Sequence, residues 1–583
     1  MPPGRASRRA LRGAGKRAPQ PFWARLRLMP HPDRYSPFST HNGPVYDSKH
    51  SWRPLGSPES MSEGAAKPPV TIVKDQTKVT SGAEVQDKLI SAAQVFSDLL
   101  KPTFGPRGLD KMLYKADGTT AITNDGAKIV AELLVKHPAA KMMVSMGNSQ
   151  EEACGDGVTT TMLLCGSLLQ QASTLMRKGL HPLTLVDGYQ VALVSARNQM
   201  DTDTQSVSDE RLLAVAETAL RGKGAEAALD HFSLIVVEAL TTLAANRDDA
   251  GAEHVAMFKT GTGGLRDSRM VRGVIINRRV LMDTLPNRLT DAKVAVLGGD
   301  LKIRSMTRDA EIQITDAEQL DSFVDAEQAR KDALAEAVIA SGAQVILCSG
   351  EVDRDILHRL SDEDILAVGE LDESEVRNAA EAVGANIVDS ILDIEPADLG
   401  ACGSLLWERR EATDQVEDII RIEECASPRV VTIEVGGSGE TATEEIIRGL
   451  HDALRATSLA IASGELLPGG GSIHARMAHA VRRASEAEPG RARLAMDAFA
   501  RALETIPSTL VENAGGDPLD RVLELRAAAR EDGGFVGITA DGAVGAADGV
   551  WHPRAVIEDG LEAATETAMS MLRIDQVISA RGD

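Results

Sequence analysis

Residues 151–169, EEACGDGVTTTMLLCGSLL, place an aspartate between two glycines, directly before a run of threonines and an apolar stretch at helical spacing. Gly155 and Gly157 let the backbone approach a ligand closely. The first-turn amides of the helix predicted from about Thr159 form an anion site, and Asp156 supplies the hard oxygen that Mg2+ prefers beside a phosphate. The stretch is therefore either a phosphate cradle with a built-in metal ligand or, more commonly for an isolated Gly-Asp-Gly, a plain N-cap turn.

Two further aspartates and several glycine loops could complete such a site, although each alone has a simpler interpretation. Asp125 in TNDG stands where a strand becomes a helix, a position typical of turns. Asp452 in RGLHDALRAT reads alone as a solvated helix residue, and Lys223 in RGKGAE suits either a phosphate or plain exposure. The loops TFGPRG (103–108) and LLPGGGSI (466–473) could pass their backbone over a nucleotide or simply be flexible.

Several well-known catalytic signatures are missing from the sequence. It has no Gly-x4-Gly-Lys-Ser/Thr segment, which argues against a P-loop NTPase, and no Gly-x-Ser-x-Gly elbow or His-Glu-x-x-His helix. The five cysteines lack Cys-x-x-Cys spacing and support neither a zinc site nor a disulfide framework. Because no run of about 18 consecutive apolar residues occurs, we expect no membrane span, and a reducing cytoplasm is the simplest location.

The elements that must position these residues change character along the chain. Residues 81–100 carry the apolar stripe of a half-buried helix, and KMLYKADGTTAIT (111–123) predicts a hairpin that leads to Asp125. From about 272, short apolar runs alternate with helical stretches, which indicates an α/β segment, and residues 315–342 predict one long helix. From about 440 the chain is mainly helical again. This order predicts an inner domain inserted into an outer one.

Charge is unevenly distributed over the 583 residues, a length that implies several domains. Residues 1–60 hold 11 Lys and Arg against 3 Asp and Glu, whereas the remainder holds 52 against 83. We exclude this basic leader from the fold as disordered; it is either a transit peptide or, as we favour because it lacks an amphipathic stretch, an upstream extension or misassigned start before Met61. The acidic body argues against a nucleic-acid partner, because a phosphate-binding surface is basic, and it suits a salt-rich cytoplasm.

Taken in order, the motifs resemble the group II chaperonins, the thermosomes of archaea and their eukaryotic cytosolic relatives. The resemblance covers Val70 to Ala580, through TFGPRGLDKML, ITNDGA, GDGVTT, ALRGKGAE, DALRAT, LPGGG, ENAGGDPLD and LRIDQVI. It implies a multidomain α and α/β subunit with three domains: a mainly helical equatorial ATP-binding domain (61–207 and 465–583), a hinge-like intermediate domain (208–276 and 430–464) and an α/β apical substrate-binding domain (277–429). The apical domain would carry a helical protrusion near 303–328 that closes the chamber without a separate lid.

The resemblance also implies a role for each candidate site residue. Asp156 would bind Mg2+, Asp125 and Asp452 would orient or deprotonate the attacking water, and Lys223 would sense the γ-phosphate. The other residues would contact ATP: Gly105, Pro106, Gly157, Val158, Thr159, Thr160, Gly471 and His552. Phosphoryl transfer depends mainly on such positioning, charge neutralisation and an aligned nucleophile.

Four positions depart from the pattern of the family that the sequence resembles. Val158 replaces a threonine and removes a hydroxyl from the phosphate cradle, at a cost of about 0.5 to 1.5 kcal/mol of affinity. His474 follows the triple glycine where a glutamate is usual, His552 stands at the position of an acidic residue near the ribose, and Val435 replaces an arginine. All three aspartates are present, so we expect an active but divergent paralogue.

The sequence therefore predicts an ATP-hydrolysing, cytoplasmic chaperonin subunit that assembles with itself or with paralogues into two stacked rings and folds non-native polypeptides. The alternative is a structural or specificity subunit of a hetero-oligomeric ring that hydrolyses ATP weakly, which Val158 and His552 favour. A metabolic ATPase without a ring is a third interpretation, against which the long apical insert argues.

Overall fold

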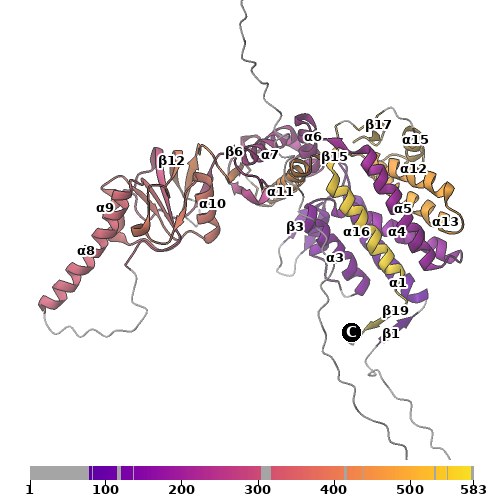
Figure 1. Ribbon diagram of the computed structural model, residues 1–583, viewed down its shortest axis with the longest axis horizontal. Coiled ribbons are helices and arrows are strands. Elements are labelled where there is room, and N and C mark those ends of the chain that lie inside the picture. The colour runs from indigo at the N-terminus through magenta and orange to yellow at the C-terminus, as the bar shows by residue number, and fades with distance from the viewer. Residues whose placement is uncertain are drawn as a thin grey trace, which may run out of the picture. The chain divides into compact units, whose positions relative to one another are not determined.

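The structure is a computed structural model, and its elements are labelled in Figure 1. It describes residues 78–81, 83–114, 118, 120–135, 137–303, 317–411, 416–437, 439–530, 534–547 and 549–579. The basic leader and residues 304–316 of the expected protrusion lie outside the described residues. The chain divides into two compact units, Met1–Val85 with Ile574–Asp583, and Gln86–Arg573. In the first unit, β1 (Lys78–Ser81) pairs antiparallel with β19 (Gln576–Ser579).

The second unit contains a helical region built from both ends of its chain. Its N-terminal helices are α1 (Ala83–Leu100, entering this unit at Gln86), α2 (Gly126–Ala131), α3 (Pro138–Cys154), α4 (Val158–Arg177) and α5 (Pro182–Asp203). Its C-terminal helices are α12 (Ser472–Ala487), α13 (Ala492–Leu503), α14 (Thr505–Asn513), α15 (Pro518–Ala528) and α16 (Arg554–Leu572). α4 packs against α13 and α16, and α5 packs against α12 and α13. Met162, Leu163 and Leu164 are all buried, so α4 is covered on every side and lies at the centre of this region.

Short strands join these helices near the residues predicted to form the site. β2 (Lys111–Tyr114) and β3 (Thr120–Thr123) form the predicted hairpin. β15 (Glu465–Pro468) pairs antiparallel with β4 (Gln205–Ser206) on one side and with β18 (Trp551–Pro553) on the other. β16 (Val536–Ile538) pairs with β17 (Val544–Ala546). Through β15 and β18, the triple-glycine loop lies beside a strand that is distant from it in sequence.

A second group of helices packs with a small sheet. It consists of α6 (Asp209–Leu220), α7 (Leu229–Ala244), α11 (Glu440–Ser463), β5 (Val255–Lys259), β6 (Arg269–Val271) and β14 (Val431–Val435), with strand order β5-β14-β6. Glu226–Ala244 is long and apolar enough to cross a membrane by length and composition, but half of that window is buried and α7 packs against α6 and α11. The segment therefore has the character of a core helix.

The predicted α/β segment is confirmed. Its mixed sheet has the order β10-β9-β8-β12-β13-β7, and β11 pairs with β8. The strands are β7 (Val274–Asn277), β8 (Arg288–Leu297), β9 (Val345–Cys348), β10 (Leu366–Val368), β11 (Ile387–Val388), β12 (Gly400–Glu411) and β13 (Val416–Glu423). β8 to β11 pair in parallel, whereas β12, β13 and β7 add antiparallel strands. The helices of this region are α8 (Ala317–Ser341), α9 (Arg354–Ser361) and α10 (Glu373–Val383).

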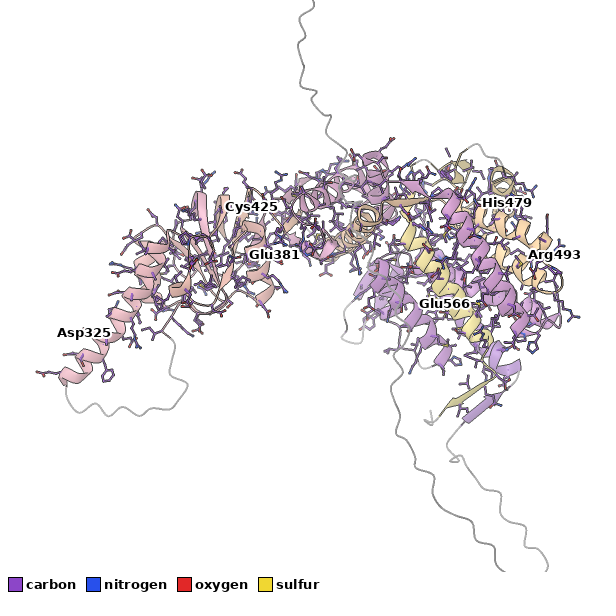
Figure 2. The ribbon with its side chains drawn as sticks, viewed as in Figure 1. Asp325, Glu381, Cys425, His479, Arg493 and Glu566 are labelled. Carbon is purple, nitrogen blue, oxygen red and sulfur yellow. The ribbon has the colours of Figure 1, made fainter. Side chains whose placement is uncertain are left out.

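The long helix predicted over 315–342 is present as α8, but only its C-terminal half belongs to a core. Val338 is buried, whereas Phe323 and Val324 are 47% and 57% exposed. Figure 2 shows Asp325 near the free end of α8, with the sheet at the other end of the helix. The apolar stripe thus extends beyond the core that it would be expected to cover, as a projecting helix requires.

Candidate active site

The Gly-Asp-Gly turn joins α3 to α4 and leaves the start of α4 without a side-chain cap. α3 ends at Cys154, and α4 begins one residue earlier than predicted, at Val158. Gly155 (φ 65°) and Gly157 (φ 87°) are both left-handed, and a Cβ atom on Gly155 would lie 2.3 Å from Cδ of Arg455. Because the N-cap Gly157 has no side chain, the first-turn amides of α4 are available to an anion.

The backbone of Asp156, at the centre of this turn, is held from behind. Gln150 on α3 donates from Nε2 to the carbonyl of Asp156 (3.0 Å) and to that of Val556 (3.3 Å). The Asp156 carboxylate accepts a hydrogen bond from the amide of Gly157 through Oδ1 (2.7 Å). A carboxylate can accept about four hydrogen bonds, so lone pairs remain for a ligand.

Asp125 caps α2 at the predicted junction of a strand and a helix. Its Oδ1 accepts from the amide of Ala127 (2.9 Å), and its own amide donates to Oγ1 of Thr123 (3.1 Å). These two bonds fix the backbone and the carboxylate together. The turn interpretation is therefore correct for the backbone, and the side chain also lines the cavity described below.

Asp452 on α11 and Lys223, which follows α6, form an ion pair in which the side chains are 16% and 17% exposed. Lys223 donates from Nζ to Oδ2 of Asp452. Burial raises the pKa of Asp452 to about 7; Lys223 opposes this rise, whereas the charges of Asp125 and Asp156 add to it. Burial lowers the pKa of Lys223, but the surrounding carboxylates outweigh burial and hold that pKa above its ordinary value. The pair thus combines a permanent cation with a carboxyl group that titrates near neutral pH.

Two glycine loops form further walls. Asn513 holds the loop of Gly105 and Pro106 by donating from Nδ2 to two carbonyl groups at 2.8 Å each. Gly471 is the N-cap of α12, and Gly469 donates from its amide to a carbonyl in the turn before β18 (2.8 Å). Both loops are therefore fixed by hydrogen bonds to distant parts of the chain.

The structure brings all of the predicted site residues together around one cavity of about 450 Å³. They are Gly105, Pro106, Asp125, Asp156, Gly157, Val158, Thr159, Thr160, Lys223, Asp452, Gly471 and His552. Val158, which stands where the family pattern has a threonine, is buried. It therefore contributes only apolar surface in place of a hydroxyl group. The predicted residues supply uncapped helix amides, a cation and three carboxylates, which suits a phosphorylated ligand with a metal ion.

His474 and His552, two of the departures noted in the sequence, line the same cavity. His474 is 5% exposed, and its Nδ1 has no hydrogen-bond partner in the described part of the protein. Burial lowers the pKa of His474 to about 3, and burial also lowers the pKa of His552. The His474 ring is therefore neutral at physiological pH. Val435, the fourth departure, is buried at the end of β14 and lies outside the cavity.

Sequence reasoning missed three charged residues that line the cavity, Glu151, Glu217 and Arg221. Burial together with the charge of Asp125 raises the pKa of Glu151. Arg455 contacts Oε1 of Glu151 through Nη1 (3.4 Å) and the carbonyl of Glu152 through Nη2 (3.2 Å). The spacing of three residues between Asp452 and Arg455 was the available signal for the position of Arg455, because residues three apart lie on one face of a helix.

The chain is similar over most of its length to known chaperonins. Residues 96–582 match the TCP-1/cpn60 chaperonin family. Thermosome subunit alpha of Archaeoglobus fulgidus is 36% identical over 523 residues, which cover 88% of this chain and 95% of that protein. A thermosome subunit of Methanopyrus kandleri is 36% identical over 509 residues (86% and 93%), and thermosome subunit alpha of Halobacterium salinarum is 33% identical over 528 residues (89% and 93%).

These similarities confirm the family, the fold class and the ATPase class predicted from the motifs. Members of this family are ATPases that couple hydrolysis to protein folding. The similarities do not favour the weakly hydrolysing structural subunit, and they leave no basis for a metabolic ATPase without a ring. The chain belongs to the TCP-1/cpn60 chaperonin family, in its group II branch, and is a subunit of an ATP-dependent chaperonin.

Proposed function

We propose that the cavity binds ATP with Mg2+ and that its three aspartates and Lys223 hydrolyse it. The observation that carries the proposal is the convergence of the predicted residues, from distant parts of the sequence, around one cavity that opens on the uncapped end of α4. The amide of Gly157 and the hydroxyl groups of Thr159 and Thr160 would hold phosphate oxygens. The loop of Gly105 and Pro106 would cover the nucleotide, and Gly471 would lie beside its base and sugar.

The donor set at Asp156 fits Mg2+. This ion usually takes one or two carboxylates and completes its shell with phosphate oxygens and water. Within the described ranges, no group of three or more His, Cys, Asp and Glu side chains could hold a metal ion. Asp156 would therefore bind Mg2+ together with the phosphate groups of the nucleotide. When bound, the ion neutralises phosphate charge.

Asp452 would deprotonate or orient the attacking water, assisted by Asp125, which lines the same cavity. A general base works best when its pKa lies near the working pH, and burial places the pKa of Asp452 at about 7. In the structure Lys223 pairs with Asp452. A γ-phosphate entering the cavity would compete for Lys223 and free the carboxylate for water.

We infer that each subunit has the three domains implied by the resemblance: equatorial (61–207 and 465–583), intermediate (208–276 and 430–464) and apical (277–429), with a protrusion near 303–328. The exposed N-terminal half of α8 supports the protrusion. The relatives named thermosome subunit alpha and subunit beta support a ring that contains paralogues. We propose two stacked rings in the cytoplasm that enclose non-native polypeptides.

The test compares Asp452→Ala with wild type and with Glu444→Ala, a matched control on the same helix that pairs with Lys259 outside the cavity. Asp452→Ala should abolish phosphate release while calorimetry still detects binding of Mg-ATP, and Glu444→Ala should retain both activities. Wild-type turnover in Asp452→Ala would refute its role in activating water. Negative-stain images of the full chain, alone and with co-expressed paralogues, should show rings, and monomers under both conditions would refute the assembly.

A further inference from the structure

Arg455 on α11 is a charged residue beside the cavity that the proposed mechanism leaves without a role. It follows Asp452 by three residues, so the two side chains leave the helix on one face. Its side chain is 39% exposed and is absent from the described residues that line the cavity. An effect of Arg455 on ATP hydrolysis would therefore pass through the residues that it contacts.

The guanidinium group of Arg455 binds the C-terminal end of α3. Nη2 donates to the carbonyl of Glu152 (3.2 Å), and Nη1 lies 3.4 Å from Oε1 of Glu151. α3 ends at Cys154, so the Glu152 carbonyl is one of the last four, which have no partner within a helix. This end of α3 has no basic residue in its own last turn, and the helix dipole favours a cation there. Arg455 supplies that cation from another helix.

The stem of Arg455 fills the space that Gly155 leaves open. A Cβ atom on Gly155 would lie 2.6 Å from Nε and 2.9 Å from Cβ of Arg455. The φ of 65° at this position is one that asparagine also adopts, so the close approach of Arg455 is a second and stricter reason for glycine. Arg455 thus contacts both the end of α3 and the turn that carries Asp156.

The partner of Arg455 on α3 belongs to the charged wall of the cavity. The side chain of Glu151 lines the cavity. Burial and the charge of Asp125 raise the pKa of Glu151, whereas Arg455 and Lys223 lower it. Asp125 and Lys223 also act on Asp452. The ion pair therefore ties α11 to the same group of charges that surrounds Asp452.

We propose that Arg455 is a positioning residue that holds α11 against the end of α3 and so keeps Asp452 in reach of the attacking water; this inference rests on the proposed ATP site. The phosphate-binding amides and hydroxyl groups belong to the beginning of α4, which follows the turn. Loss of the Arg455 contacts would leave the phosphate groups bound but would release α11. Because a misplacement of about 1 Å can cost about 100-fold in rate, the loss should appear in kcat.

The test compares Arg455→Ala and Arg455→Lys with wild type, each as the assembled full chain. Arg455→Ala should lower kcat for phosphate release about 10- to 100-fold, while calorimetry should find the dissociation constant for Mg-ATP within about twofold of wild type, less than the effect of one hydrogen bond. Arg455→Lys should recover part of the rate, because an ammonium group can still donate to the Glu152 carbonyl. Glu444→Ala, on the same helix, is the matched control and should keep both values.

A double-mutant cycle with Gly155→Ala separates positioning from a general loss of stability. The left-handed backbone strains Gly155→Ala in either background, but the steric conflict arises only where Arg455 is present. Gly155→Ala should therefore lower kcat by a larger factor in wild type than in Arg455→Ala. Equal factors in the two backgrounds would overturn the inference.

Two further results would count against Arg455 as a positioning residue. One is an Arg455→Ala variant with the kcat of wild type, and the other is a variant whose affinity for Mg-ATP falls as much as its kcat. If Arg455→Ala does not fold, Arg455→Gln, which keeps part of the stem, allows the same comparison. Wild type that does not bind Mg-ATP would instead overturn the proposed ATP site.

Discussion

The buried carboxyl group of Asp452 should give ATP hydrolysis a steep dependence on pH near neutrality. An aspartate of ordinary pKa would be fully ionised from pH 6 to 8 and would leave the rate flat. Burial raises the pKa of Asp452 from 3.8 to about 7, so about 9% of this group is ionised at pH 6 and about 91% at pH 8. Because only the ionised form can accept a proton from water, kcat/KM should rise about tenfold over this interval.

The assay is phosphate release at low ATP concentration with saturating Mg2+, which keeps the terminal phosphate of the nucleotide deprotonated over the range. Lys223→Met gives an independent arm, because Lys223 lowers the pKa of Asp452. Its removal should move the midpoint of the profile to higher pH even if affinity for ATP also falls.

Asp452→Asn is the control, since an amide does not titrate. Its residual turnover should be about 100- to 10,000-fold lower, the usual contribution of a general base, and flat with pH. A wild-type profile that changes by less than about twofold between pH 6 and 8 would refute the reasoning, because a carboxyl with that pKa must change its ionisation. A midpoint that moves to lower pH in Lys223→Met would also refute it.

Three further predictions concern single side chains. Gly157→Ala should weaken ATP binding and lower the midpoint of thermal unfolding. The φ of 87° at this position and a Cβ atom 2.9 Å from Val556 Cγ1 would impose strain of about 1 to 3 kcal/mol. Wild-type affinity for ATP in a calorimetric titration of the variant would contradict this prediction. Asp418→Ala should destabilise the α/β region by about 1.5 to 3 kcal/mol, the range for hydrogen bonds to a charged group, because Asp418 is 0% exposed and pairs with Arg409, which keeps its contact with Asp283 in the variant. Urea unfolding followed by Trp407 fluorescence would measure this loss. Tyr189→Phe should cost only about 1 kcal/mol, since it removes one hydrogen bond to the Leu168 carbonyl (2.7 Å) without leaving a charge, and an effect as large as that of Asp418→Ala would be the contrary result.

Local chemistry made much of the fold and of the candidate site predictable from the sequence. Gly155 and Gly157 both have a left-handed backbone, which glycine adopts most readily. The Gly-Asp-Gly sequence therefore predicts the geometry of this turn. Asp125 caps a helix with the same side chain that lines the cavity. The short apolar runs after residue 272 became strands because each is long enough for one strand and is bounded by turns.

Features that depend on distant partners could not be predicted in the same way. Periodicity alone could not say whether a neighbouring element covers the apolar stripe of α8, whose Phe323 and Val324 are exposed. Only the resemblance implied a protrusion over this part of the helix. The contact between His552 and Gly469 depends on the pairing of β15 with β18, which joins residues far apart in sequence. Spacing alone could not reveal that His552 feels the charge of Asp156 in the turn.

The proposed mechanism ties hydrolysis to the position of a single helix, α11. On this helix, Asp452 forms an ion pair with Lys223, which follows α6. Arg455, one turn later on α11, contacts the end of α3 before the Gly-Asp-Gly turn. Two turns earlier, Glu445 accepts a hydrogen bond from Thr123 (3.2 Å), next to Asp125. Because spacings of three and seven residues place these side chains on one face, moving α11 away from the cavity would break all three contacts together. The general base would then be withdrawn while the phosphate-binding turn stayed intact, so ATP could bind without being hydrolysed.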